Sequence, residues 1–281
     1  MAICNVCQNH CDIKENALGI CMARRCIDGS VRSDNYGYIT SIALDPIEKK
    51  PLRMFYPGTK ILSVGSYGCN LRCPFCQNNE ISYGLDPKIM RGVARYISPK
   101  ELVNIALSCR DDGNIGIAFT YNEPLVGYEY VTDTTRIAKE RGLKTVLVSN
   151  GCASKDIYTQ LEVDAMNIDL KGFTNEYYRD VLRGDRRMVM DFIEYSARRC
   201  HVEVTCLIVP GLNDSDEEIK KLSLWLASLN DGKGKKEIAL HISRFFPQFR
   251  MRDRDATDVG LIYYLADLAR DHLENVFTGN C

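Results

Sequence analysis

The chain has 281 residues, 45% of them hydrophobic, so it is long enough to bury one large core with a small appended lobe. Its 36 basic and 37 acidic side chains nearly cancel, which gives no indication of a nucleic-acid-binding surface. The first residues lack a basic and apolar leader, and no apolar run is long enough to span a bilayer, so we expect a soluble, cytoplasmic protein with no membrane partner.

Thirteen cysteines are many for such a chain, and they are clustered. Disulfides are disfavoured in the cytosol, so clustered cysteines there indicate metal ligands or catalytic groups. One cluster occupies the first 26 residues and a second occupies residues 69–76. The scattered ones are predicted to be small buried hydrophobes: Cys109, Cys152, Cys200, Cys206 and Cys281.

The first cluster supplies four thiols within 18 residues, at Cys4, Cys7, Cys11 and Cys21. So short a segment cannot fold on a hydrophobic core, and we expect a metal to hold it together. Four thiolates complete a structural zinc site, which we favour because the ligand set is closed. They could equally hold a second iron–sulfur cluster that relays electrons, or remain free thiols.

We divide the chain into a cysteine-rich lobe with a strand-and-turn extension, residues 1–59, and a core, residues 60–281. In the core, apolar runs rich in Val and Ile alternate with amphipathic helical patterns, as in parallel strands covered on both faces. Capping boxes at Ser98/Glu101 and Ser215/Glu218 mark two helix starts. The predicted strands are 60–66, 115–120, 144–149, 164–170, 202–209 and 237–242, with a weaker one at 275–278.

This alternation predicts right-handed βαβ units in one parallel sheet. Six such units indicate an α/β fold, a partial (β/α)6 barrel with the cysteine-rich lobe at its N-terminal end. Active groups in such folds lie at the carboxyl ends of the strands.

The second cysteine cluster follows the first core strand directly, with Cys69, Cys73 and Cys76 in a C-x3-C-x2-C spacing. Iron–sulfur cubanes usually take four thiolates, so three would leave one iron open to another ligand. The alternative is a zinc knuckle with a distant fourth ligand, and the position at a strand end favours the cluster.

With Phe75 before its last cysteine, this segment resembles the signature of the radical SAM superfamily. In that family the three thiolates hold a 4Fe–4S cluster, and the amino and carboxylate groups of S-adenosylmethionine (SAM) chelate the fourth iron. Reductive cleavage of SAM yields a 5′-deoxyadenosyl radical that abstracts hydrogen from a substrate. The resemblance implies these roles for Cys69, Cys73 and Cys76.

The resemblance also implies SAM contacts at the later strand ends. Glu123 follows the second strand, where the family usually carries two glycines in place of Tyr121 and Asn122. Polar residues end the third and fourth strands as well. The expected SAM contacts are Glu123 to the ammonium, Ser149 and Asn150 to the ribose or carboxylate, and Asp169 with Lys171 near the carboxylate.

Each of these residues has a structural alternative: a solvated loop glutamate, an ordinary Asn-Gly turn, or an ion pair without a functional role. His241, at the sixth strand, is expected either to contact adenine or substrate or to be a satisfied core histidine. Phe75 packs either on adenine or in the core.

The N-terminal half narrows the resemblance further. Cys4-Asn5-Val6-Cys7, the segment 43–52 and Phe55-Tyr56-Pro57-Gly58 look like the radical SAM member of the AmmeMemoRadiSam gene system, which is related to pyruvate formate-lyase activating enzymes. We therefore expect a radical SAM enzyme that acts on an unidentified small molecule or protein and takes electrons from a flavodoxin- or ferredoxin-like donor. The alternatives are a glycyl-radical enzyme activase and a non-catalytic iron–sulfur or zinc protein.

Overall fold

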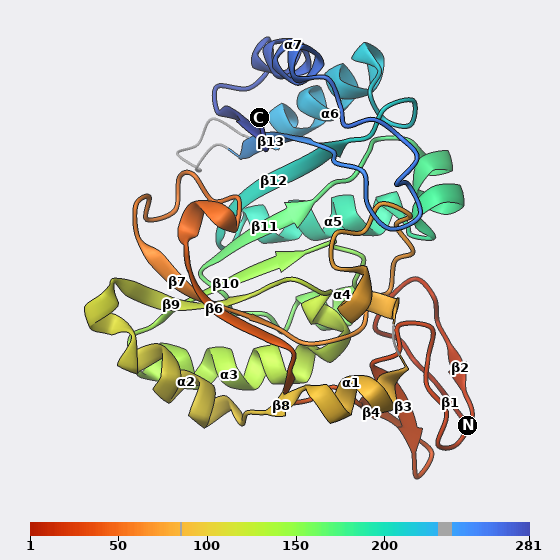
Figure 1. The fold of residues 1–281 in the computed structure, drawn as a ribbon, viewed down its shortest axis with the longest axis vertical. Coiled ribbons are helices and arrows are strands. Elements are labelled where there is room, and N and C mark those ends of the chain that lie inside the picture. Colours follow the sequence, from red (N-terminus) through yellow and green to blue (C-terminus); the bar gives the residue numbers. More distant parts are fainter. Residues whose placement is uncertain (85, 230–237) are drawn as a thin grey trace.

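An open eight-stranded sheet organises the chain in the computed structural model, which describes residues 1–84, 86–229 and 238–281 (Figure 1). The strand order is β14-β13-β12-β11-β10-β9-β7-β6. Strands β7 and β9 to β14 run parallel, and β6 adds an antiparallel edge. Because β6 and β14 form the two edges, the sheet is a partial barrel, as the sequence predicts.

The core strands lie close to their predicted positions. Those of the parallel sheet are β7 Lys60–Gly65, β9 Asn114–Phe119, β10 Lys144–Ser149, β11 Ala165–Asp169, β12 His201–Ile208, β13 Ala239–Arg244 and β14 Val276–Gly279. Residue 237, where the sixth strand was predicted to begin, lies outside the described residues. Most positions in β9 to β13 are buried, as expected for strands covered on both faces.

Helices cover the outer face of the sheet in the order of the chain (Figure 1). They are α1 Pro87–Val93, α2 Pro99–Ser108, α3 Tyr128–Glu140, α4 Lys155–Tyr158, α5 Arg186–Ala197, α6 Asp216–Ser228 and α7 Val259–Arg270. Short 3-10 or π turns are η1 Ile47–Lys49, η2 Glu80–Gly84, η3 Arg110–Asp112, η4 Pro124–Gly127 and η5 Tyr177–Leu182. No helix of the described chain combines the length and the apolar character that crossing a bilayer requires.

Helix α2 begins as predicted, whereas α6 differs in its cap and α3 was not predicted. The capping box at Ser98 and Glu101 is present at α2. At α6, Ser215 caps the helix but Glu218 does not bond back to it, because its carboxylate accepts the backbone N–H of Phe173 instead. Helix α3 was not predicted, since its buried stripe includes Thr134 and Thr135 and its apolar pattern is therefore weak.

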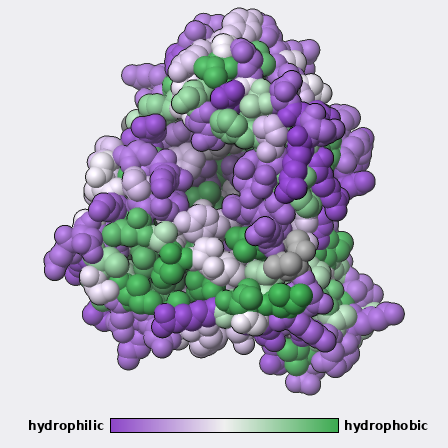
Figure 2. Space-filling view, viewed as in Figure 1, coloured by the Kyte–Doolittle hydropathy of each residue, from purple (hydrophilic) through white to green (hydrophobic). Residues whose placement is uncertain are grey.

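The first 59 residues form small paired strands around the edge of the barrel (Figure 1). These are β1 Ala2–Ile3 with β2 Asp12–Ile13, β3 Arg24–Ile27 with β4 Ser30–Ser33, and β5 Tyr38–Ile39 with β8 Arg95–Tyr96. Strand β6, Ser41–Pro46, pairs with β7 and so joins this extension to the main sheet. The space-filling view shows the molecule hollowed near the centre of one face, with hydrophilic residues around the opening (Figure 2).

A buried carboxylate fastens the segment after η1 to the interior of the barrel. Glu203, on β12, accepts hydrogen bonds from the backbone N–H groups of Arg53 (2.9 Å) and Met54 (2.8 Å). Its oxygens also lie 2.8 Å from Nε2 of His201 and 2.6 Å from Nε2 of His241. Burial raises the pKa of Glu203, but these four contacts outweigh it and lower the pKa to about 2.

We predict that Glu203→Gln lowers the free energy of unfolding at pH 7 by about 2–4 kcal/mol, because the amide cannot satisfy the same donors. A depressed pKa means that the carboxylate stabilises the fold fully above its ordinary value near 4.5 and loses this effect as the pH falls towards 2. Urea unfolding between pH 5 and pH 2 should show a shallower acid loss in the variant. Glu217→Gln, at an exposed i,i+4 pair, is the control and should change stability by less than about 0.5 kcal/mol.

Candidate active site

A cavity of about 1200 Å³, measured to its open mouth, lies where the parallel strands end. Side chains from the loops or ends of β7, β9, β10, β11, β12 and β13 line it. Nearly all the residues predicted for a site meet here: Cys69, Cys73, Phe75, Cys76, Glu123, Ser149, Asn150, Asp169 and Lys171. The carboxyl ends of parallel strands share one edge of the sheet, which is why residues so far apart in the sequence converge.

The three cysteines lie on one loop that leaves β7 through Gly68. Gly68 has a φ of 92°, and a side chain there would meet the carbonyl oxygen of Cys21 at 2.6 Å, so glycine is required on both counts. Burial raises the pKa of the Cys73 thiol to about 11. Binding a metal would deprotonate such thiols, since thiolates are the ligating form.

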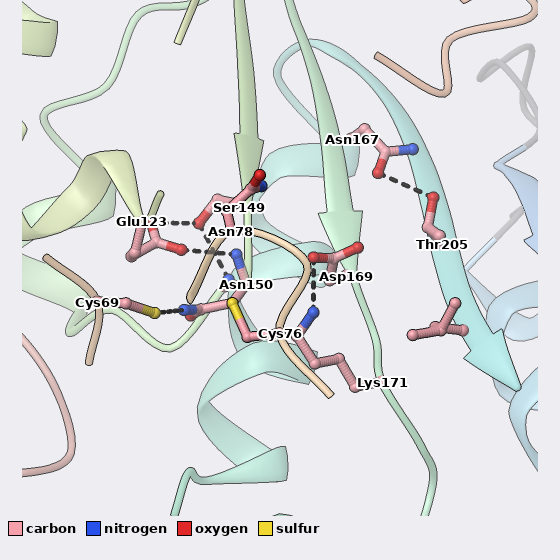
Figure 3. A network of polar contacts seen from close by, with 12 residues as sticks. Cys69, Cys76, Asn78, Glu123, Ser149, Asn150, Asn167, Asp169, Lys171 and Thr205 are labelled. Atoms are coloured by element: carbon pink, nitrogen blue, oxygen red, sulfur yellow. Dashed lines mark hydrogen bonds and ion pairs between the residues drawn. The ribbon is translucent and has the colours of Figure 1, made fainter. Parts of the chain in front are cut away.

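Glu123 connects the ends of β9 and β10 (Figure 3). It is 2% exposed, and its carboxylate accepts hydrogen bonds from the hydroxyl of Ser149 (2.8 Å) and from the backbone N–H groups of Asn150 (2.7 Å) and Leu125 (3.0 Å). Burial outweighs these bonds and raises the pKa of Glu123 to about 7. The solvated loop glutamate considered from the sequence is therefore excluded.

Asn150 extends this network to the cysteine loop (Figure 3). Its Nδ2 lies 3.6 Å from the sulfur of Cys69 and 2.9 Å from Oδ1 of Asn70. Asn70 in turn donates to the carbonyl of Cys152 at 2.7 Å. An amide N–H near a ligating sulfur stabilises a thiolate, so this contact suits a metal-bound Cys69.

Asp169 and Lys171 form an ion pair of 2.8 Å at the end of β11 (Figure 3). Burial lowers the pKa of Lys171, but the Asp169 carboxylate outweighs this effect and raises it, so the ammonium stays charged. One N–H of that ammonium goes to Asp169, which leaves donors for an anionic ligand. The pair lines the cavity and is therefore positioned to bind ligand as well as to stabilise the strand end.

One wall of the cavity was not predicted. Tyr121 donates its hydroxyl to Asp45 (2.9 Å), which also binds Lys50 (2.9 Å), and the Lys50 ammonium lies 4.8 Å from the centre of the Tyr121 ring. Tyr121 has a φ of 73°, in the region that favours glycine, consistent with the glycine usual at this position in the resembled family. Lys50 could not be assigned to the site from the sequence, because it lies outside the predicted parallel strands. It lines the cavity because β6, the strand before it, pairs with β7.

Thr205 and Ser243 were also missed, although both line the cavity. Thr205 follows Glu203 by two positions and Ser243 follows His241 by two, so strand alternation places each pair on one face of the sheet. The alternation of side chains along β12 and β13 was the signal from which Thr205 and Ser243 could have been predicted. His241 itself does not line this cavity, because it lies deeper in the barrel on Glu203.

The donor set suits an iron–sulfur cluster with one iron left without a protein thiolate. Among the residues lining the cavity, the cysteines are Cys69, Cys73 and Cys76, and histidine is absent from that lining. Nowhere in the described ranges do three His, Cys, Asp or Glu side chains converge closely enough to hold a single metal ion. Three thiols and no histidine in the lining match the three-thiolate ligand set that leaves one iron of a cubane open.

Comparisons with known proteins agree with this geometry. A family model described as the radical SAM superfamily matches residues 63–223, more than half of the chain. An uncharacterized protein of Methanocaldococcus jannaschii is 38% identical over 279 residues, which cover 99% of this chain and 80% of that protein.

Two further comparisons extend this similarity. The pyruvate formate-lyase 1-activating enzyme of Escherichia coli K12 is 26% identical over 171 residues, 59% of this chain and 68% of that protein. Among solved structures, Streptococcus suis SuiB bound to S-adenosylmethionine matches with a TM-score of 0.58 at 15% identity, over 76% of this chain and 48% of that one. At that identity the match concerns the fold alone.

The raised pKa of Glu123 predicts a pH dependence of stability. Its folded pKa of about 7 exceeds the ordinary value of 4.5, so the folded protein holds this proton more tightly than the unfolded chain does. The free energy of unfolding of cluster-free protein should therefore fall as the pH rises from about 4.5 to 7, by at most about 1.4 kcal/mol per pH unit. This slope should be missing in Glu123→Gln and retained in Glu140→Gln, an exposed control at the end of α3. Urea unfolding between pH 5 and pH 8 measures it, and an unchanged slope in Glu123→Gln contradicts the assignment.

Proposed function

We propose a function from one premise: this chain belongs to the radical SAM superfamily. Members of that family use a 4Fe–4S cluster and SAM. In our proposal Cys69, Cys73 and Cys76 hold the cluster, which when bound supplies the electron that cleaves SAM to a 5′-deoxyadenosyl radical, the agent that abstracts hydrogen from the substrate. The electron comes from a flavodoxin- or ferredoxin-like donor.

One observation carries the proposal. Three thiols, a buried carboxylate and an ion pair from separate strand ends line a single cavity, and each matches a group that SAM presents. Cys69, Cys73 and Cys76 would hold the cluster, and the charged side chains around it would position SAM beside it. The protein charges lie on either side of the cysteine loop, with Glu123 on one side and Lys171 with Asp169 on the other (Figure 3).

Glu123 is suited to hold the SAM ammonium. Its oxygens accept three hydrogen bonds, of which Oε2 accepts only one, so Oε2 retains acceptor capacity. A cation beside Glu123 would lower the pKa that burial raises, so the carboxylate would be charged when SAM is bound. Ser149 and Asn150 keep the carboxylate in position, since each donates to it.

Lys171 is suited to hold the SAM carboxylate. Its ammonium is charged and held by Asp169, whose carboxylate orients it without using all its donors. Phe75 lines the same cavity and packs edge-on against Phe245, with 6.4 Å between ring centres. In our proposal its ring contacts the adenine. The remaining wall, with Lys50 and Tyr121, is left for the substrate, which is a small molecule or a protein segment.

Replacing Cys69, Cys73 or Cys76 with Ala should remove the cluster and abolish reductant-dependent formation of 5′-deoxyadenosine. The reason is that two thiolates cannot hold a cubane with one open iron already present. Chromatography of the nucleoside product after anaerobic reconstitution measures this. Cys109→Ala, at the end of α2, is the control and should retain product. Retained product in a Cys69, Cys73 or Cys76 variant refutes the assignment, and product from the wild-type chain excludes a non-catalytic iron–sulfur or zinc protein.

Lys171→Met should weaken SAM binding by about tenfold or more while leaving the cluster iron unchanged, because it removes a charged donor and leaves Asp169 unpaired. Titration of reconstituted protein with SAM, followed by electron paramagnetic resonance, gives the affinity. The matched control is Lys139→Met, at an exposed pair with Glu162. Equal affinities in the two variants would remove Lys171 from the SAM site.

A second candidate function is activation of a glycyl-radical enzyme. It is favoured by the similarity to an Escherichia coli pyruvate formate-lyase 1-activating enzyme and by the Asp169-Leu170-Lys171 pattern of that group. Incubation with a glycyl-radical protein, SAM and reductant should then produce the doublet signal of a glycyl radical. Formation of 5′-deoxyadenosine without that signal would support a different substrate.

A further inference from the structure

The four N-terminal cysteines come together around one small cavity. Cys4, Cys7, Cys11 and Cys21 all line it, and three of the four are buried, with Cys11 half-buried. The remaining lining combines apolar residues, including Val6, Ile13 and Val126, with Asn9 and the buried Arg24. Four thiols around one cavity form a complete ligand set for a metal group that takes them as thiolates.

The hydrophobic core of the N-terminal lobe is small. Its buried cluster is small and borrows Ile157 from the barrel, with Cys4, Val6, Ile13 and Cys26 as its other buried members. Strands β1 and β2 contain two residues each. A core this small contributes little stability to some 25 residues, and a group bound by the four thiols would add to it.

The cavity between the four cysteines has room for more than a single ion. It measures about 270 Å³ to its mouth, which leaves space for a multi-atom group. Within the described chain no such set converges on a single-ion site.

The lobe packs directly on the loop that carries the other cysteines. The backbone N–H of Cys69 donates to the carbonyl of Cys21 at 3.2 Å. Asn9, whose side chain lies 3.6 Å from the sulfur of Cys7, donates to the carbonyl of Asn70 at 3.0 Å. Hydrogen bonds thus connect the segments that carry Cys7 and Cys21 directly to the loop that carries Cys69.

We propose that Cys4, Cys7, Cys11 and Cys21 hold a second, fully thiolate-ligated 4Fe–4S cluster that passes electrons to the cluster at Cys69, Cys73 and Cys76. A reduced flavodoxin- or ferredoxin-type donor loses one electron, the N-terminal cluster gains it and then loses it, and the cluster at Cys69 is reduced by one electron. With four thiolates this second cluster has no open iron and binds no SAM. Its relay role rests on the proposed function, whereas its presence does not.

Metal content tests the presence of the cluster. Anaerobically reconstituted wild-type protein should carry about eight iron and eight sulfide per chain, and the triple variant C69A/C73A/C76A, whose lobe is intact, about four of each. The double variant C7A/C21A should likewise retain about four iron. Cys26→Ala is the matched control, because Cys26 is a buried cysteine of the same lobe that does not line the cavity, and it should keep all eight.

The triple variant keeps the inference falsifiable even if C7A/C21A fails to fold. Background iron with about one zinc in the triple variant would overturn it in favour of a structural zinc site, and background levels of both metals would leave only free thiols. Four iron in the triple variant, with no SAM cleavage by the wild type, would sink the proposed function while the second cluster stands.

The relay role has its own readout. After mixing with reduced flavodoxin, the electron paramagnetic resonance signal of the SAM-bound cluster should grow several-fold more slowly in C7A/C21A than in Cys26→Ala. Equal rates of growth would overturn the relay. Because this signal reports reduction and not product, it is independent of the identity of the substrate.

Discussion

The buried carboxylate of Glu123 is the interaction on which the arrangement of the site depends. It ties the turn after β9 to the end of β10 through Ser149 and Asn150, and Asn150 continues to Asn70 and to the sulfur of Cys69. Burial makes its charge costly, which is tolerable only because three donors converge on it. Two strand ends and the cysteine loop are therefore held as one polar unit, before any ligand is present.

The barrel interior is organised in two polar layers. In the lower layer Glu203 contacts two histidines and two backbone N–H groups. These contacts fill the barrel interior beneath the site and hold the segment after η1 in place. In the upper layer Thr205 and Ser243 face the cavity from the same strands. Since side chains on one face recur every second residue, a two-residue step along β12 or β13 moves from a structural contact to a ligand-facing one.

The N-terminal lobe and the barrel meet at the cysteine loop. Cys21 accepts the backbone N–H of Cys69, the side chain of Arg72 donates to the carbonyl of Ile20, and Gln8 and Asn9 both reach the carbonyl of Asn70. The loop that carries Cys69 is thus supported on one side by the lobe and on the other by the strand ends. A group that stabilises the lobe would therefore also stabilise the position of the loop that carries Cys69.

The sequence by itself determined the parallel α/β fold, since apolar runs and helical stripes of the right lengths alternate, and it identified the cysteine loop, because ligand spacing is a local property. Glu123, Ser149, Asn150, Asp169 and Lys171 could be named because each ends a predicted strand, and the structure brings all five to one cavity. Only the tertiary structure decided which interior residues face ligand. His241 lies in the lower layer, where it contacts Glu203. Lys50 and Tyr121 lie in the cavity wall because β6 pairs with β7. These placements depend on depth within the barrel and on contacts between distant segments, and neither is encoded in the spacing of residues along the chain.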